Sequence, residues 1–500
     1  MNSMKRQRAP STIASALGVA LLLNGCMVGP NFVRPEGPAD AHFTSEAAKA
    51  GAGAAQDTGK DAPRQTIDYG RDIAGDWWTL FHSDALNTLV ADAVAQNHGL
   101  DAMKATLAQS EQLALSTAGA RYPQVGLTGG AGRQKYGAEF LGGTINLPPF
   151  TYFAVGPNVS YTLDYNGGVA RAVEREYALV DSSRQQFNAA YLSVTGQTVM
   201  QAIAIASASE QLSMVEALLA QDRDNLQLVQ RAFDAGSVAR IDILSAQSQI
   251  NSDMTLLPPL RQELSRARHA LAILLGKTPA GASIPALDFD AVQLPMAIPV
   301  GIPSELARRR PDILQAEAQL HAATSAVGIA ESNLYPKIQL TASVAQEALT
   351  PGRLVNGSAT AWSMAAGFTA PLFDGGSLRA QKRAAVDALH ASAANYEQIV
   401  LEAFGQVADL LDALDHDTEQ VDAQKHAQDT AQDALNLARA SYSEGNVGIL
   451  QVLDAQRVYQ QSRLGEARAA AQRYLDSAQL ILALGGSNPA GASLATNAGG

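Results

Sequence analysis

The chain carries one pattern twice, and the two copies lie a whole domain apart. Six positions of the first copy return 209 residues later with identical or similar side chains: Phe233, Gly236, Val238, Leu244, Ala246 and Gln247 correspond to Tyr442, Gly445, Val447, Leu453, Ala455 and Gln456. Solenoid repeats are only about 20–50 residues long. We therefore interpret the chain as a duplicated structure, with repeats over 76–290 and 291–484, in which neither half can bury its apolar surface alone.

The first residues predict an exported lipoprotein. A basic start is followed by an apolar run, 13–23, that is too short to span a bilayer as a permanent helix. The run leads into Cys26, the only cysteine of the chain, in a sequence that resembles a bacterial lipobox. The alternative is a buried thiol after an unusual cleavage site. We expect 1–25 to be removed as a signal peptide and Cys26 to be acylated, which adds about 0.8 kcal/mol of membrane affinity per buried methylene.

Composition argues against several classes of function. The net charge of −12 opposes binding to nucleic acid, because no basic stripe is available to neutralise phosphates. Hydrophobic content is 47% but aromatic content is only 6%, which favours close packing between long helices over a large aromatic core. The 8 histidines are scattered without the spacing of metal ligands. We expect no metal site, no cofactor apart from the covalent lipid, and no enzymatic activity.

The segment between the anchor and the first repeat predicts an extended linker. Residues 26–75 hold the lipid anchor and a stretch rich in Gly, Ala, Asp and Pro that has no periodicity. Order is expected to begin at 76–81, where two tryptophans are interpreted as packing residues. A helix is predicted over 86–120 from its apolar spacing. The chain end, 485–500, is expected to be disordered.

The hydropathy period then changes to two in both repeats. Apolar residues alternate with polar ones over 338–344 and over 362–372, and the first repeat shows a weaker version of the same alternation. Alternation over about ten residues is typical of transmembrane barrel strands, although a soluble sandwich has the same pattern. We expect β-hairpins at about 123–165 and 336–373.

Two proline-free stretches, 171–231 and 379–439, predict very long helices. At about 1.5 Å per residue, each would be on the order of 90 Å long. The glycines beyond them, Gly236 and Gly445, are typical of the position after a helix terminus. The expected helical hairpins are 171–276, which Pro258-Pro259 should break or restart, and 379–484.

Four strands per chain predict an oligomer. No run of 18 or more apolar residues follows Cys26, so a membrane crossing has to use strands. Membrane barrels need at least about eight strands, and an open edge in lipid leaves backbone groups unpaired. Two copies would close a filled barrel, and three would close twelve strands around a lumen. The expected fold is an α+β membrane protein with four barrel strands per chain and long coiled-coil helices, assembled as a homotrimer.

Several motifs together resemble one family. They are the segment 29–35 after the cysteine, the pair Trp77-Trp78, the segment 309–312 with the sequence Arg-Arg-Pro-Asp, and the segment 453–457. The chain resembles the outer-membrane factors of tripartite efflux systems, the TolC- and OprM-like lipoproteins of the NodT type. The resemblance implies a trimer with a 12-stranded barrel in the outer membrane on a periplasmic helical tunnel. It also implies a periplasmic adaptor and an inner-membrane transporter of the RND type as partners.

The resemblance places function at the two helical turns. The adaptor-contacting tips would be Gly236, Val238, Ala239, Gly445, Val447 and Gly448, and the gate would be Asp454, Arg457, Tyr442 and Asp242. Around a threefold axis, Asp454 would favour cations and oppose anions. The alternative is an ordinary surface pair between Asp454 and Arg457. Arg240 departs from the small or apolar residue usual at the tip, which leaves the identity of the adaptor open. Ser245 replaces the gate aspartate in the first repeat, so we expect one hairpin to move more than the other.

The leading interpretation is a passive export duct for drugs and other small toxic compounds. The same duct could serve type I protein secretion. From another class, a structural lipoprotein could tether the outer membrane to the cell wall, but this alternative leaves the four alternating strands unexplained.

Overall fold

The structure is a computed structural model that describes residues 27–37, 43, 64–71, 73–137, 143 and 148–486. The predicted signal peptide, Cys26, most of the linker and most of the chain end lie outside these residues. The chain divides into two compact units, each assembled from separate stretches of sequence. The first unit comprises 1–34, 107–183 and 316–396, and the second comprises 35–106, 184–315 and 397–500.

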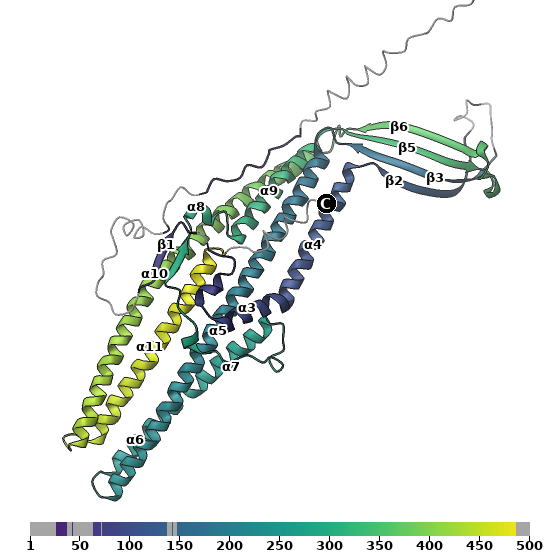
Figure 1. The fold of residues 1–500 in the computed structure, drawn as a ribbon. Coiled ribbons are helices and arrows are strands. Elements are labelled where there is room, and N and C mark those ends of the chain that lie inside the picture. The colour runs from purple at the N-terminus through teal and green to yellow at the C-terminus, as the bar shows by residue number, and fades with distance from the viewer. Residues whose placement is uncertain are drawn as a thin grey trace, which may run out of the picture. The chain divides into compact units, whose positions relative to one another are not determined.

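The first unit contains a four-stranded antiparallel sheet, in the order β2-β3-β5-β6 (Figure 1). Its strands are β2 (Gln124–Gln134), β3 (Phe150–Leu163), β5 (Lys337–Ala348) and β6 (Thr360–Thr369). The central pairing, β3 with β5, joins a strand from each repeat. The alternating segments of the two repeats therefore combine into one sheet.

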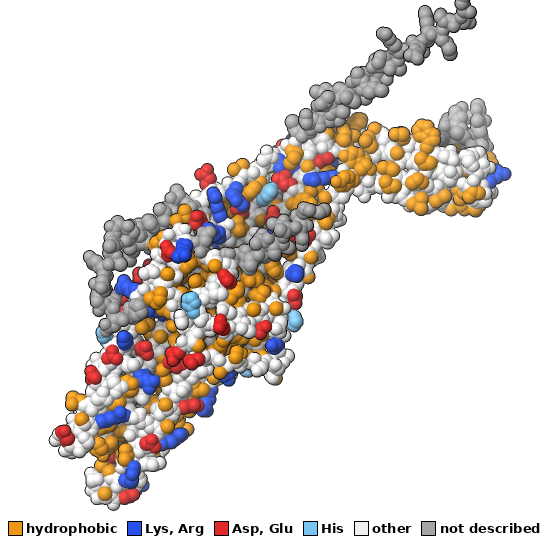
Figure 2. Space-filling view, viewed as in Figure 1, with side chains coloured by type: hydrophobic (Ala, Val, Ile, Leu, Met, Phe, Trp, Pro, Cys, Tyr) orange, Lys and Arg blue, Asp and Glu red, His pale blue; other side chains and the backbone are white. Residues whose placement is uncertain are grey.

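The register of this sheet separates apolar from polar side chains. One row across the four strands consists of Val125, Val159, Ala342 and Met364, all apolar. The adjacent row consists of Gly126, Asn158, Ser343 and Ser363, all small or polar. Successive residues point to opposite faces, so the sheet has one apolar face and one polar face. Figure 2 shows apolar side chains spread over the sheet, with most charged side chains on the helices.

The same unit holds the segment just after the predicted lipid site. Arg171, only 1% exposed, reaches this segment from α5 (Gly168–Asp234). Its Nη2 donates to Asn31 Oδ1 at 2.6 Å, and its Nε donates to the Val28 carbonyl at 3.3 Å. Phe32 stacks on His321 of α9 (Pro311–Ser332), with ring centroids 4.4 Å apart. The first part of the segment 29–35 is thereby fixed against α5 and α9.

The second unit contains the apolar core and most of the long helices. α5 continues to Asp234, and α10 (Ser377–Ser443) is followed by α11 (Ile449–Ala483). Its shorter helices include η1 (Trp77–Phe81), α3 (Asp84–Gln96), α6 (Arg240–Met254), α7 (Leu257–Leu274), η4 (Phe289–Ala291) and α8 (Pro303–Leu306). Trp77 and Phe81 are almost fully buried in the core, together with Ile203, Leu271 and Leu480. The tryptophan segment therefore packs, as expected.

The prediction of one helix over 86–120 is wrong, because the structure has two. α3 ends at Gln96 and α4 (His98–Ala118) begins after Asn97. The Asn97 Oδ1 accepts a hydrogen bond from the Leu100 N–H at 3.1 Å, and its Nδ2 donates to the Leu274 carbonyl at 2.9 Å. Asparagine at this position satisfies a free N–H group at the start of a new helix, which favours a break over continuation.

A second, smaller sheet was not predicted. β1 (Thr66–Tyr69), at the end of the predicted linker, pairs in parallel with β4 (Ala297–Val300). Its pairing places Ile298 and Val300 in the core with no exposure. The linker therefore ends in ordered structure before residue 76.

The return helix of the first repeat is interrupted, as expected near its paired prolines. α6 ends at Met254, and α7 places Pro258 and Pro259 in its first turn, where a missing N–H costs nothing. Among the described residues, one helix, α5, has an 18-residue window apolar enough for a membrane span, with mean hydropathy 1.3 and 56% of that window buried. Val199, Ile203 and Ile205 of α5 belong to the core.

Candidate functional site

The two helical turns have the same backbone construction. Gly236 has φ +73° and Gly445 has φ +78°, in the left-handed region that favours glycine. In the first turn, the Ser237 N–H donates to the Ala232 carbonyl at 2.9 Å, and in the second the Asn446 N–H donates to the Ser441 carbonyl at 2.9 Å. These bonds satisfy carbonyls at the end of each long helix. Both glycines therefore close their helices, whatever else they contact.

The two tips differ in the residues after the glycine. In the first, the Asp242 Oδ2 accepts a hydrogen bond from the Ala239 N–H at 2.8 Å and so caps the start of α6. The preceding Val238 is half-buried, whereas Ala239 and Arg240 are exposed. Asp242 consequently has a structural role at this turn, in addition to the gate role that the resemblance implies.

In the second tip, Gly448 is exposed and precedes α11 without a side-chain cap. Ile449, the counterpart of Arg240 in the duplication, is only 5% exposed and packs with Val452 and Leu435. Val447 is half-buried. One tip therefore presents a cation where the other buries an apolar side chain.

The predicted gate residues are only partly brought together within one chain. Arg457 donates to Asp454 at 2.7 Å, and the side chain of Asp454 is 67% exposed and that of Arg457 40%. Tyr442 is 37% exposed. Within the described ranges, no hydrogen bond or ion pair joins Asp242 or Tyr442 to the Asp454–Arg457 pair. A single chain thus supplies the pair, and the remaining two positions lie at the surface of the turns.

A groove beside Asp454 has a volume of about 390 Å³ and lies between α10 and α11. Its lining is mostly small and apolar, with Ala438, Ala455 and Val458 next to the carboxylate. On the neighbouring surface of α10, Leu437 is 70% exposed. An apolar strip with a carboxylate at its edge is suited to contact with another helix.

The sequence analysis did not identify a buried polar cluster formed by α5, α6 and α11. Asp222 of α5 and Asp253 of α6 are 5% and 8% exposed, and Gln456 of α11 is 2% exposed. The Gln456 Nε2 donates to Asp222 Oδ1 at 3.4 Å, and its Oε1 accepts from Asn225 Nδ2 at 3.1 Å. Burial and the neighbouring Asp253 raise the pKa of Asp222 to about 7. The one available signal was an aspartate on the apolar stripe of a long helix.

A second buried cluster joins α10 to α11. Asp417 and Asp476 are 7% and 9% exposed, close to Arg473, which is 4% exposed. The Arg473 Nε donates to the side chain of Gln65 at 3.1 Å, just before β1. Burial and Asp476 raise the pKa of Asp417 to about 7. Arg473 therefore links this buried cluster to the residue that precedes β1.

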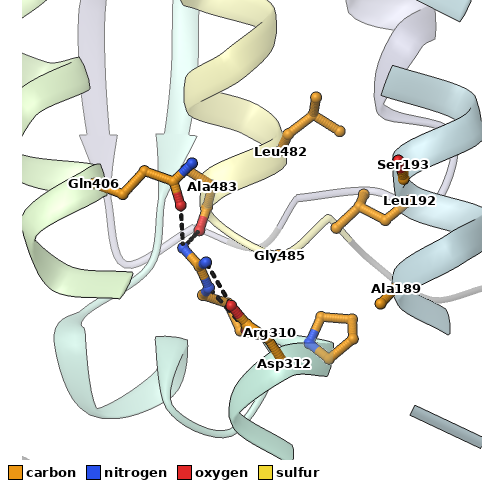
Figure 3. A pocket seen from close by; sticks show the side chains of 10 residues that line it. Ala189, Leu192, Ser193, Arg310, Asp312, Gln406, Leu482, Ala483 and Gly485 are labelled. Atoms are coloured by element: carbon orange, nitrogen blue, oxygen red, sulfur yellow. Dashed lines mark hydrogen bonds and ion pairs between the residues drawn. The ribbon is translucent and has the colours of Figure 1, made fainter. Parts of the chain in front are cut away.

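The Arg-Arg-Pro-Asp motif lies at a small pocket of about 220 Å³ (Figure 3). Arg310 donates twice to Asp312, at 3.0 and 2.7 Å, and its Nη1 donates to the Ala483 carbonyl at 2.8 Å and to Gln406 at 3.1 Å. One side chain thus connects the start of α9 to α10 and to the end of α11. The motif has a packing function here. Within the described part of the chain, no group of three or more His, Cys, Asp or Glu side chains could hold a metal ion.

Comparison with known proteins gives one consistent result. The family model described as "Outer membrane efflux protein" matches residues 89–277 and 302–486. Nodulation protein T of Rhizobium leguminosarum bv. trifolii is 29% identical over 482 residues, covering 94% of this chain and 96% of its own length. The cation efflux system protein CusC of Escherichia coli (strain K12) is 27% identical over 475 residues, covering 94% of this chain and 98% of its own.

Among solved structures, the outer-membrane channel OprN matches with a TM-score of 0.81 at 27% identity. The match covers 92% of this chain and 99% of the OprN chain. Both repeats, the long helices and the sheet are therefore accounted for by one known architecture. The chain belongs to the outer membrane efflux protein family, whose members are the outer-membrane factors of tripartite efflux systems.

Proposed function

We propose that three copies of this chain form a passive export channel for drugs and other small toxic compounds. The observation that carries the proposal is the sheet of the first unit. It has one apolar face and one polar face, and within the described residues its outer strands β2 and β6 each pair on one side only. In lipid, an unpaired edge costs several kcal/mol per backbone group, so the edges require partners.

Three copies supply those partners by pairing β2 of one chain with β6 of the next. The resulting 12-stranded barrel would present Val125 and Met364 to lipid and Asn158 and Ser343 to a water-filled lumen. Apart from Lys337 and Glu347 of β5, the residues of the four strands on this inner face are uncharged, which favours a wide and unselective passage. We place the barrel in the outer membrane and the helices in the periplasm, with lipid on Cys26 as a further anchor.

The tips are proposed as the gate and the docking surface. In a trimer, Asp454 would recur around the axis, and Tyr442 and Asp242 would face helices of neighbouring chains. Val238, Ala239, Val447 and Gly448 would contact a periplasmic adaptor, which joins the channel to an inner-membrane transporter of the RND type. Arg240, exposed and without an ion-pair partner among the described residues, favours an adaptor that carries an acidic group at this point.

Purified full-length protein tests the channel directly. We expect a trimer that dissociates on heating in gels and discrete conductance steps in planar bilayers. A monomer that stays in solution without detergent and does not conduct would contradict the proposal and favour the tether.

Susceptibility profiling of a deletion strain tests the cargo. Greater sensitivity to several unrelated drugs is expected, with complementation by the intact gene as the control. Unchanged sensitivity combined with loss of one secreted protein would favour type I secretion. Sensitivity restricted to metal ions would point to cation export, the activity named for the relative CusC.

A further inference from the structure

Two aspartates are buried side by side in the first helical hairpin. Asp222 lies on α5 and Asp253 on α6, at 5% and 8% exposure. A buried carboxylate without a cation is costly, because the low-dielectric interior does not replace the water that it loses. Two carboxylates at one site repel each other in addition, so they cannot both remain ionised at low cost.

The hydrogen bonds around the pair leave room for one proton. Gln456 of α11 donates to Asp222 Oδ1 at 3.4 Å, and Gln249 of α6 donates to Asp253 Oδ2 at 2.8 Å. Asp222 Oδ2 is buried and has no donor among the described residues. A proton on either carboxyl supplies that donor and joins Asp222 to Asp253 by a hydrogen bond. Asn225 completes the arrangement by donating to Gln456 Oε1 at 3.1 Å.

Among the described residues, no hydrogen bond or ion pair joins an arginine or lysine to the pair, and Arg223, next to Asp222 on α5, is exposed. α6 contributes Asp253, α11 contributes the uncharged Gln456, and the neighbouring apolar cluster consists of Val215, Leu219, Ile250, Leu260 and Leu464. The arginines that are nearest in sequence to Asp253 and to Gln456 form ion pairs with other residues. Arg261 lies 3.4 Å from Glu216 and Arg457 lies 2.7 Å from Asp454, both at exposed positions. Burial and Asp253 accordingly raise the pKa of Asp222 to about 7, within the range that an external compartment reaches.

The pair is connected to the candidate gate through one helix. Gln456 is buried on the inner face of α11, and the adjacent Arg457 pairs with Asp454 on the exposed face. Its counterpart in the first repeat, Gln247, is exposed. The glutamine of α11 therefore links the α5–α6 hairpin to the helix that carries the gate pair, whereas the corresponding glutamine of α6 is exposed.

We propose that Asp222 and Asp253 share one proton and act as a pH-sensitive brace, which holds α5, α6 and α11 together while the proton is present. Loss of the proton leaves two buried carboxylates that repel each other, so α6 moves away from α5 and water enters between them. Because α6 and α11 begin at the two tips, this movement favours opening of the proposed channel at the tips. This regulatory role rests on the proposed channel function, whereas the brace itself does not.

Spin labels test the brace without any transport assay. The chain has no cysteine beyond Cys26, so cysteines introduced at the exposed Gln227 of α5 and Ser248 of α6 label selectively in purified full-length protein. The distance between the labels is measured from pH 5.5 to pH 8.5. We expect a narrow distribution at low pH and a longer, broader one at high pH, with a midpoint near the pKa of the pair.

Asp222→Asn retains a donor permanently and is expected to keep the narrow distribution at every pH. Asp253→Asn provides an independent second variant. Asp224→Asn, the same change at an exposed site on the same helix, is the matched control and should titrate like the unmodified chain. A distance that does not change with pH in the unmodified chain would overturn the proposal, as would an Asp222→Asn variant that titrates normally.

Conductance in planar bilayers separates the brace from the channel. We expect open probability to rise between pH 5.5 and pH 8.5 in the unmodified channel and to stay low in Asp222→Asn. A protein that never conducts but shows the pH-dependent distance would support the brace and contradict the proposed channel function. A conducting protein whose label distance does not change with pH would support the channel function and contradict the brace.

Discussion

Arg457 donates a hydrogen bond to Asp454 across 2.7 Å, one turn apart on α11, and both side chains face solvent in the single chain. An exposed pair of this kind contributes only about 0.2–1 kcal/mol to stability. Its position next to the groove of about 390 Å³, and not its strength, makes it a candidate for contact with another chain.

The double substitution Tyr442→Phe with Arg457→Ser is expected to raise single-channel conductance severalfold. It removes a hydroxyl and a guanidinium that would hold neighbouring tips closed in the trimer. Recordings in planar bilayers measure the effect. Arg439→Ser, at an exposed site on α10, is the control. Equal conductance in the double variant and the unmodified channel would remove the gate assignment.

Asp417 is expected to make stability depend on pH. Burial and Asp476 raise its pKa to about 7, whereas an aspartate in the unfolded chain has a pKa of about 3.9. Between these values the folded state holds a proton that the unfolded state has released. The free energy of unfolding therefore falls as pH rises through this window. Asp417→Asn should lose less melting temperature between pH 5 and pH 8.5 than the unmodified protein.

Calorimetry on the purified protein at fixed concentration gives the comparison. Asp429→Asn, at an exposed site of the same helix, should follow the unmodified protein. Parallel curves for the Asp417 variant and the unmodified protein would mean that this carboxyl does not take up a proton on folding.

Arg171→Ala is expected to release the segment just after the predicted lipid site. Arg171 makes charged hydrogen bonds to Asn31 and Glu174, and bonds of this type contribute about 1.5–3 kcal/mol each. Although burial opposes it, hydrogen bonds from His321 and Arg171 lower the pKa of Glu174. The variant should melt earlier and be cleaved by thermolysin near Phe32. Arg175→Ala, at a site 42% exposed, should change neither result.

Gly156→Ala is expected to disrupt assembly of the sheet. A Cβ at Gly156 would collide with the Val344 carbonyl oxygen of β5, which is backbone and cannot turn aside. At Gly130 of β2, a Cβ would meet nothing within 4 Å, so Gly130→Ala is the control. Gel mobility of unheated outer-membrane fractions reports the amount of the proposed trimer. Normal trimer levels in the Gly156 variant would show that β3 and β5 need not approach so closely.

The strands and the long helices were predictable because each has a repeating signal. The alternation over 338–344 matches the two-residue period of a strand. The absence of proline over 379–439 permits an uninterrupted helix. The pairing of β1 with β4 was not predictable, since each strand has only four residues and a linker composition surrounds β1. Short strands are specified by their tertiary partner and not by their own pattern.

The candidate site divides in the same way. Gly236 and Gly445 could be assigned from turn chemistry alone, whereas Gln456 could not be separated from a surface residue. Its counterpart Gln247 has the same side chain in the same motif and is exposed. Burial of one copy and exposure of the other result from how two hairpins of one duplicated chain pack, which a local sequence does not encode.

The two open strand edges have a genetic consequence. In the proposed trimer, β2 of each chain must accept β6 of the next, so one subunit with a blocked edge leaves the whole ring unsealed. If half of the chains in a cell carried such a defect, random mixing would leave roughly one ring in eight intact. Alleles that damage β2 or β6 are therefore expected to be dominant, whereas alleles that abolish synthesis are expected to be recessive.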